Sequence, residues 1–339
     1  MSHRVSQSSQ SSLRSLGGHP FKVVKIDGLV ILKIMKHFGL EGGLVSSIPV
    51  QGVLLGLLEN DTLEITNCFA FPRQGDDDHD FDEVTYQRDM VKNLRKINID
   101  HLQVGWYQSS VYGYFLSKSL IEAQHSYQNS VEESVVVIYD PARTSQGCLG
   151  IKAFRLKANF MKLFGDAEIN MQLLNKYSMN YDRMFEEVPV TIRNSSLVKS
   201  LLSEMDIKYP QPRDTEILNL GFCSSLERQM QMLMDYVDRL GNDSTRYLSY
   251  YRGYMKAQQQ RAQHQQQKER ENMLREKRGE PLLPQEDLDR MFRLPQPPHR
   301  LDNILNQGQV KNFCEAIQQG AAQSFGKLFM AEALHLADG

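Results

Sequence analysis

The sequence predicts an α/β domain over its first half, followed by an extended α-helical region. Up to about residue 156, short β-branched runs alternate with segments that have helical spacing of apolar residues. From residue 226 a heptad pattern begins, and a polar helix-like stretch without Pro or Gly continues it. The chain has 339 residues, of which 41% are apolar, so one domain with a long appendage or two units is expected.

Composition excludes several classes of protein. The net charge of −2 gives no global basic field that would draw the chain onto nucleic acid or a membrane. The four cysteines contain no CxxC pair, which argues against a zinc ribbon or a redox pair and suits a reducing compartment. Residues 1–20 are rich in Ser and Gln and are predicted to be a disordered tail without a signal sequence. We therefore expect a cytoplasmic protein.

Residues 21–156 alternate between strand-like and helix-like patterns. The run at 50–58 is continuously apolar and contains Gly52 and Gly56, as expected for a buried strand that a neighbour approaches closely. With the run at 63–71 it predicts a hairpin. The pattern indicates a mixed sheet flanked by helices. Strands are expected at 21–26, 50–58, 63–71, 102–107, 134–139 and 149–156, and helices at 29–38, 81–97 and 115–127.

The segment 157–220 is predicted to be a mixed α/β extension, with a strand at 185–192 and a helix at 195–205. Residues 221–280 then predict one long helix with a heptad seam followed by a Gln-rich polar part. An excess of Lys and Arg at 256–278 leaves two interpretations open, a solvated helix or an RNA-contacting one. The apolar seam is expected to be an interface, because its apolar face would otherwise be exposed. It comprises the proposed partner contacts Leu226, Met230, Leu233, Val237 and Leu240, together with Tyr247, Tyr251 and Tyr254.

The end of the chain is predicted to contain a stiff connector and a last helix. Residues 281–300 are Pro-rich, and residues 301–339 have one apolar face on a polar helix. A helix beyond such a spacer has little of its own chain to pack on, so we expect it to join a bundle of other subunits. Deleting residues 301–339 is then expected to detach the protein from partners without unfolding the first domain. The proposed contact residues are Val310, Phe313, Ile317, Phe325 and Leu328.

One motif makes the interpretation specific. Residues 104–110 read VGWYQSS, with GVLLG upstream at 52–56 and VVVIYDP downstream at 135–141. In order and spacing these segments resemble the MPN family, whose catalytic (JAMM) members have VGWYHSHP at this point. The resemblance covers residues 21–156 and implies an MPN domain.

The resemblance also implies that the zinc site is lost. Catalytic members hold zinc with two His and one Asp, and a Glu acts as general base. Here the two His positions are Gln108 and Ser110, the Asp position is near Leu120, and the Glu position is near Pro49. A carboxamide and a hydroxyl are weak zinc ligands. We therefore expect no metal, no cofactor and no catalysis, although Glu122 lies close to the Asp position.

Beyond this frame, the chain from about residue 22 onward resembles the H-subunit family of eukaryotic translation initiation factor 3. The resemblance implies a scaffold subunit that supports binding of the small ribosomal subunit and recruitment of mRNA and initiator tRNA. It also implies pairing with the MPN domain of the F subunit and a helical bundle with several other subunits. The segments that carry it are QGVLLGL (51–57), LEITNCFAFP (63–72), NIDHLQVGWYQSS (98–110), EESVVVIYDP (132–141), MFEEVPVTIRNS (184–195), RGEPLLPQEDL (278–288), PQPPHR (295–300) and KLFMAEAL (327–334).

Two other functions remain as alternatives. A metal-dependent ubiquitin isopeptidase would need zinc ligands from elsewhere, and the chain has no HxH or HExxH. An RNA-binding factor would use the Gln/Lys/Arg helix. Trp106 and Tyr107 are expected in the core, and His79 is expected in a solvated acidic loop. His101 and His125 are expected to have structural roles.

Overall fold

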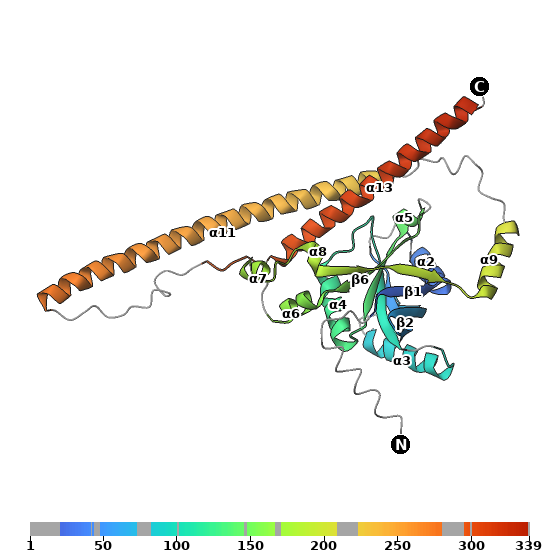
Figure 1. The fold of residues 1–339 in the computed structure, drawn as a ribbon, viewed down its shortest axis with the longest axis horizontal. Helices are drawn as coiled ribbons and strands as arrows, with labels where there is room; N and C mark the ends of the chain where they lie inside the picture. The colour runs from blue at the N-terminus through green and yellow to red at the C-terminus, as the bar shows by residue number, and fades with distance from the viewer. Residues whose placement is uncertain are drawn as a thin grey trace, which may run out of the picture.

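The computed structural model describes residues 21–41, 43, 48–72, 83–99, 102–145, 148–166, 171–208, 223–279, 295–298 and 300–337. An eight-stranded mixed sheet with flanking helices forms the α/β domain, and two long helices lie along one side of it (Figure 1). The predicted architecture is confirmed. The strands are β1 (Val23–Asp27), β2 (Gln51–Glu59), β3 (Thr62–Ala70), β4 (Gln103–Ser109), β5 (Val135–Asp140), β6 (Gly150–Leu156), β7 (Phe185–Val188) and β8 (Val190–Arg193).

The helices differ greatly in length. Most are short elements that pack around the sheet, whereas α11 has 56 residues and α13 has 37. Among the described residues, no helix combines the length and apolar content needed to cross a bilayer. The helices are α2 (Gly28–Leu40), α3 (Glu83–Lys96), α4 (Lys118–Ser130), α5 (Pro141–Ser145), α6 (Ala158–Asp166), α7 (Met171–Lys176), α8 (Tyr181–Met184), α9 (Ser196–Lys208), α11 (Cys223–Arg278) and α13 (Leu301–Ala337).

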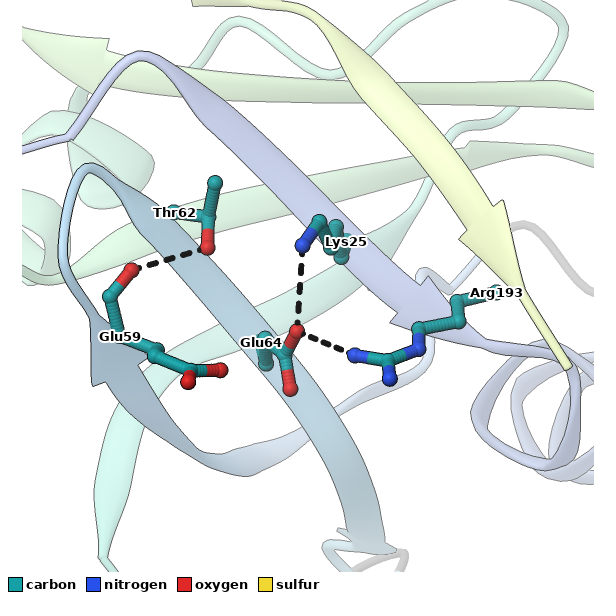
Figure 2. A network of polar contacts seen from close by, with 5 residues as sticks. All are labelled: Lys25, Glu59, Thr62, Glu64 and Arg193. Atoms are coloured by element: carbon teal, nitrogen blue, oxygen red, sulfur yellow. Dashed lines mark hydrogen bonds and ion pairs between the residues drawn. The ribbon is translucent and has the colours of Figure 1, made fainter. Parts of the chain in front are cut away.

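The sheet closes on itself through its last two strands. Its order is β7-β6-β5-β4-β2-β3-β1-β8, so β7 and β8 occupy opposite edges although only Pro189 separates them in sequence. The sheet must therefore curl until its edges meet. At the β8 edge of the sheet, Glu64 accepts a hydrogen bond from Arg193 at 2.6 Å and from Lys25 at 3.3 Å (Figure 2). These contacts join β3, β1 and β8.

Two places show how local chemistry sets the elements. The strand expected at 185–192 is two strands, because Pro189 supplies no N–H to a continuous ladder. Their pairing extends the sheet beyond residue 156, into the segment expected to be an extension. The helix expected from residue 115 begins at Lys118, because the Ser117 hydroxyl caps it by accepting the Leu120 N–H at 3.1 Å.

Apolar residues fill both faces of the sheet. Along β4, Trp106 belongs to the cluster beneath α4 and α6, while Tyr107 belongs to the cluster beneath α2. The first cluster also contains residues from the start of α13, namely Leu301, Ile304 and Leu305. The C-terminal helix is thus part of the domain's core.

Candidate functional site

The positions that correspond to a zinc site are occupied by groups that do not fit the metal. Gln108 is buried on β4, and its Oε1 accepts a hydrogen bond from Gln51 at 3.2 Å. Ser110 is buried at the end of β4, and its backbone N–H donates to the Tyr139 carbonyl at 2.8 Å. Leu120 is 2% exposed and belongs to the apolar core, and Pro49 is half-buried.

No carboxylate or imidazole replaces the missing ligands in the part of the chain that the structure describes. Those residues contain no group of three His, Cys, Asp or Glu side chains that could hold a metal ion. Glu122, next to the expected Asp position, is exposed and pairs with Lys118 at 3.6 Å. An amide, a hydroxyl, an aliphatic chain and a proline ring cannot hold zinc. This arrangement supports no metal-dependent hydrolysis.

The aromatic and histidine candidates that the structure describes lie in packed or hydrogen-bonded positions. Trp106 is buried, and its Nε1 donates to Gln124 Oε1 at 2.8 Å. The Tyr107 hydroxyl lies 2.9 Å from Nδ1 of His37, whose pKa is lowered by burial. His125 lies against Phe164 at the surface of α4. His79 and His101 fall outside the described residues, as do residues 1–20 and much of 281–300.

A small cavity separates the degenerate site from α13. It encloses about 60 Å³ and is lined by Ser110, Asp140 and Arg143 on one side and by Asn312 and Glu315 of α13 on the other. The Asp140 carboxylate accepts the backbone N–H groups of Ala142 at 3.0 Å and Arg143 at 3.3 Å, which caps α5. Burial raises the pKa of Asp140. The C-terminal helix therefore covers the end of β4 where the metal position would be.

The first half of α13 is fitted closely to the α/β domain. The fully buried Gln309 donates to the Gly113 carbonyl at 2.9 Å and accepts the Leu116 N–H at 3.3 Å. Gly308 lies against the ring of Tyr181, where a Cβ would collide with it. These contacts fix the loop between β4 and α4 to α13. Sequence reasoning missed Gly308 and Gln309, because a lone Gly and Gln on a helix carry no periodic signal.

Helix α11 packs along the same half of α13. The rings of Tyr236 and Phe313 lie 5.9 Å apart, and Arg300 lies 3.8 Å above the ring of Tyr247. Phe313 is expected at a partner interface, but it is fully buried within this chain. That expectation is wrong for Phe313, because Tyr236 of α11 and the α/β domain, and not a partner, cover its ring.

The other expected contact residues divide into two groups. The structure leaves four of them between 45% and 62% exposed, and the rest are half-buried beside the α11–α13 contact. The Gln-rich stretch lies on α11 beyond this contact (Figure 1). The exposed residues are Met230, Val237, Phe325 and Leu328, and the half-buried ones are Leu226, Leu233, Leu240, Val310 and Ile317.

Comparison with known proteins gives two family matches and several similar proteins. Residues 144–338 match a family model described as the C-terminal region of eIF3h, and residues 19–133 match JAB1/Mov34/MPN/PAD-1 ubiquitin protease. The H-B subunit of eukaryotic translation initiation factor 3 from Danio rerio is 50% identical over 315 residues, covering 93% of this chain and 94% of that protein. The H subunit of the same factor from Nematostella vectensis is 47% identical over 326 residues, covering 96% and 97%.

Proposed function

Because this chain belongs to the H-subunit family of eukaryotic translation initiation factor 3, we propose that it is a non-catalytic scaffold subunit of that complex. In this role it supports binding of the small ribosomal subunit and recruitment of mRNA and initiator tRNA. The observation that carries the proposal is the exposed apolar end of α13.

The distal end of α13 has a mostly apolar surface that is exposed in this chain. Its large apolar residues are between 50% and 68% exposed. Phe325 and Leu334 are nine residues apart, which at 100° per residue places them on opposite sides of the helix. A helix that is apolar all round is normally buried. Several surrounding helices from other subunits would provide that cover. The residues are Phe325, Leu328, Phe329, Met330 and Leu334.

The substituted metal position supports the non-catalytic part of the proposal. Gln108 and Leu120 are packed into the interior, and Ser110 faces the covered cavity beneath α13. Hydrolysis through zinc would require two imidazoles at two of these positions. The domain would then serve as a folded platform on which α13 is anchored.

Pairing with the MPN domain of the F subunit is the second part of the scaffold role. Helix α2 covers one face of the sheet with Val30, Ile31 and Ile34. Its other side presents Leu29 and Leu32, which are 55% and 61% exposed. Leu29 and Leu32 are three residues apart and so lie side by side on the helix, and a contiguous apolar patch of this kind favours contact with another protein. We propose this side of α2 as the surface that meets the F subunit.

Affinity purification of the tagged full chain from cytoplasm tests the scaffold role, with quantitative mass spectrometry of partners and zinc measured on the same sample. We expect a stoichiometric set of initiation-factor subunits and no zinc. The variant Phe325→Glu with Leu328→Glu should lose most of these subunits. Binding would move the two new carboxylates from water into the interior of the bundle, and this desolvation is costly. The matched control, Gln258→Glu with Gln260→Glu on α11, should retain them.

Two outcomes would overturn the proposal. Zinc near one equivalent together with few co-purifying subunits would indicate an enzyme. If the Phe325/Leu328 variant recovers all subunits as well as the wild type does, the distal end of α13 does not bind the other subunits.

A further inference from the structure

The cavity between the degenerate metal position and α13 has a buried polar group without a protein partner on each side. On the domain side, the Ser110 side chain is 2% exposed. Its hydroxyl lies near the Asp140 carboxylate, where it opposes the rise in pKa that burial causes, but it forms no hydrogen bond of ordinary geometry with any described residue. On the α13 side, Nδ2 of Asn312 is also buried, and it too has no partner in the described part of the chain. Both residues line the same cavity.

Two such groups on facing walls indicate that the cavity holds a ligand. A buried donor or acceptor that stays unpaired costs more free energy than a typical hydrogen bond contributes. Nearly all buried polar atoms of folded proteins are therefore paired, either with protein or with ordered water. Because Ser110 and Asn312 belong to different walls of one cavity, the same bound molecules can satisfy both.

The size and charge of the cavity determine which ligand it takes. Its volume of about 60 Å³ has room for about four water molecules at about 15 Å³ each. Two carboxylates, Asp140 and Glu315, are balanced by the cations Arg143 and Lys152. This balance favours neither a cation nor an anion. A small neutral molecule that both donates and accepts hydrogen bonds fits best, and water is the smallest such molecule.

The competing interpretation is a dry cavity. Phe115, Ile138 and Phe154 give part of the wall an apolar surface. Cavities that stay dry are lined by apolar groups, however, and a water molecule needs two to four polar partners. Ser110 and Asn312 provide two of these partners, and the charged side chains of the lining provide more.

We propose that ordered water molecules occupy this cavity and bridge Ser110 and Asp140 of the α/β domain to Asn312 of α13. The two bonds from Asp140 that cap α5 use Oδ1, so Oδ2 can accept from water. Asn312 uses Oδ1 to accept the Tyr181 hydroxyl at 3.4 Å, and its Nδ2 donates to water. The degenerate metal position is thus a hydration site whose water molecules hold the first half of α13 to the domain.

Ser134 provides an internal control for Ser110. Its side chain is 1% exposed, and its hydroxyl has no hydrogen-bond partner among the described residues either. Ser134 does not line the cavity, however. Removing a hydroxyl that is bonded to water loses hydrogen bonds, whereas removing an unpaired one relieves a cost. The two serines should therefore respond differently to the same substitution.

Urea unfolding of the purified full chain measures this difference. Ser110→Ala should lower the equilibrium constant for folding about fivefold, because the water molecules lose a partner. Ser134→Ala should leave the constant unchanged or raise it. Asn312→Ala should also lower it, and Ser110→Ala with Asn312→Ala should cost less than the product of the two single effects, because both act on the same water molecules. Ser134→Ala with Asn312→Ala should show no such coupling.

A crystal structure of the full chain gives the direct test. About two to four ordered water molecules within hydrogen-bond distance of Ser110 and Asn312 would confirm the hydration site. The proposal is overturned if the cavity is dry or contains a metal ion or an anion. It is also overturned if Ser110→Ala is as stable as the wild type, or if its effect simply multiplies with that of Asn312→Ala. None of these results bears on the scaffold role, which depends on the distal half of α13.

Discussion

The two halves of α13 are built from similar residues but have opposite environments. In the first half, Leu301, Ile304 and Phe313 are at most 7% exposed, because the α/β domain and α11 cover them. In the distal half, Phe325 and Phe329 are 62% and 68% exposed. The same helix is thus core at one end and open surface at the other.

This contrast shows what an apolar periodicity can and cannot predict. The spacing of residues 310–328 predicts a helix with an apolar face, and that helix is present. The spacing does not show whether this chain or a partner buries the apolar face, because burial depends on contacts between residues far apart in the sequence. The expectation that deleting 301–339 would leave the first domain folded is therefore corrected, since the deletion would remove Leu301, Ile304 and Leu305 from its core.

The largest expected effect comes from truncating one aromatic ring in each half. Phe313→Ala should lower the free energy of unfolding by about 3–5 kcal/mol, because it leaves a cavity in a packed interior. Phe325→Ala, the matched control, should change it by less than about 0.5 kcal/mol. Urea unfolding followed by the fluorescence of Trp106, the only tryptophan of the chain, measures both. Equal effects would mean that the two halves do not differ as described.

A buried amide tests the same contrast through hydrogen bonds. Gln309→Leu removes the bonds to Gly113 and Leu116 and leaves two buried backbone groups unpaired, so it should cost about 1–3 kcal/mol. Gln307→Leu, at an exposed position two residues earlier, should cost less than about 0.5 kcal/mol. The same unfolding assay applies. A Gln309→Leu variant as stable as the wild type would show that the loop after β4 does not depend on α13.

Much of the α/β domain could be predicted because its signals are local. Alternating strand and helix patterns and the hairpin of β2 and β3 depend on nearby residues, whereas the start of α4 was placed at residue 115 because the cap by Ser117 was not recognised. The MPN resemblance likewise rests on contiguous segments. The pairing of β8 with β1 across more than 160 residues has no such signal, and neither does the place of Gln309. The positions Gln108 and Ser110 were identified only through the motif around them.

An ion pair at the β8 edge of the sheet sharpens the comparison between covered and open surfaces. The Glu64 side chain is 15% exposed and joins Lys25 and Arg193, whereas Asp61 and Lys22 form a pair that is 67% and 77% exposed. Glu64→Gln should lower stability by about 1 kcal/mol, and added salt should reduce the difference. Asp61→Asn should have almost no effect. If both substitutions have the same effect, the Glu64 contacts do not hold β8 in place.

The smallest expected effect concerns pH and the cavity beneath α13. Burial raises the pKa of Asp140 in the folded protein, so the stability that this group contributes is present at low pH and is lost as pH rises through that pKa. Asp140→Asn keeps an oxygen that can accept the N–H groups of Ala142 and Arg143, but it removes the buried charge. The variant should therefore be at least as stable as the wild type at pH 7, and the difference should shrink as the pH falls.

Unfolding of both proteins at several pH values measures this, with the exposed Asp302→Asn as control. A clear loss of stability at pH 7 in Asp140→Asn alone would mean that attraction to Arg143 outweighs the cost of burying the carboxylate beneath α13.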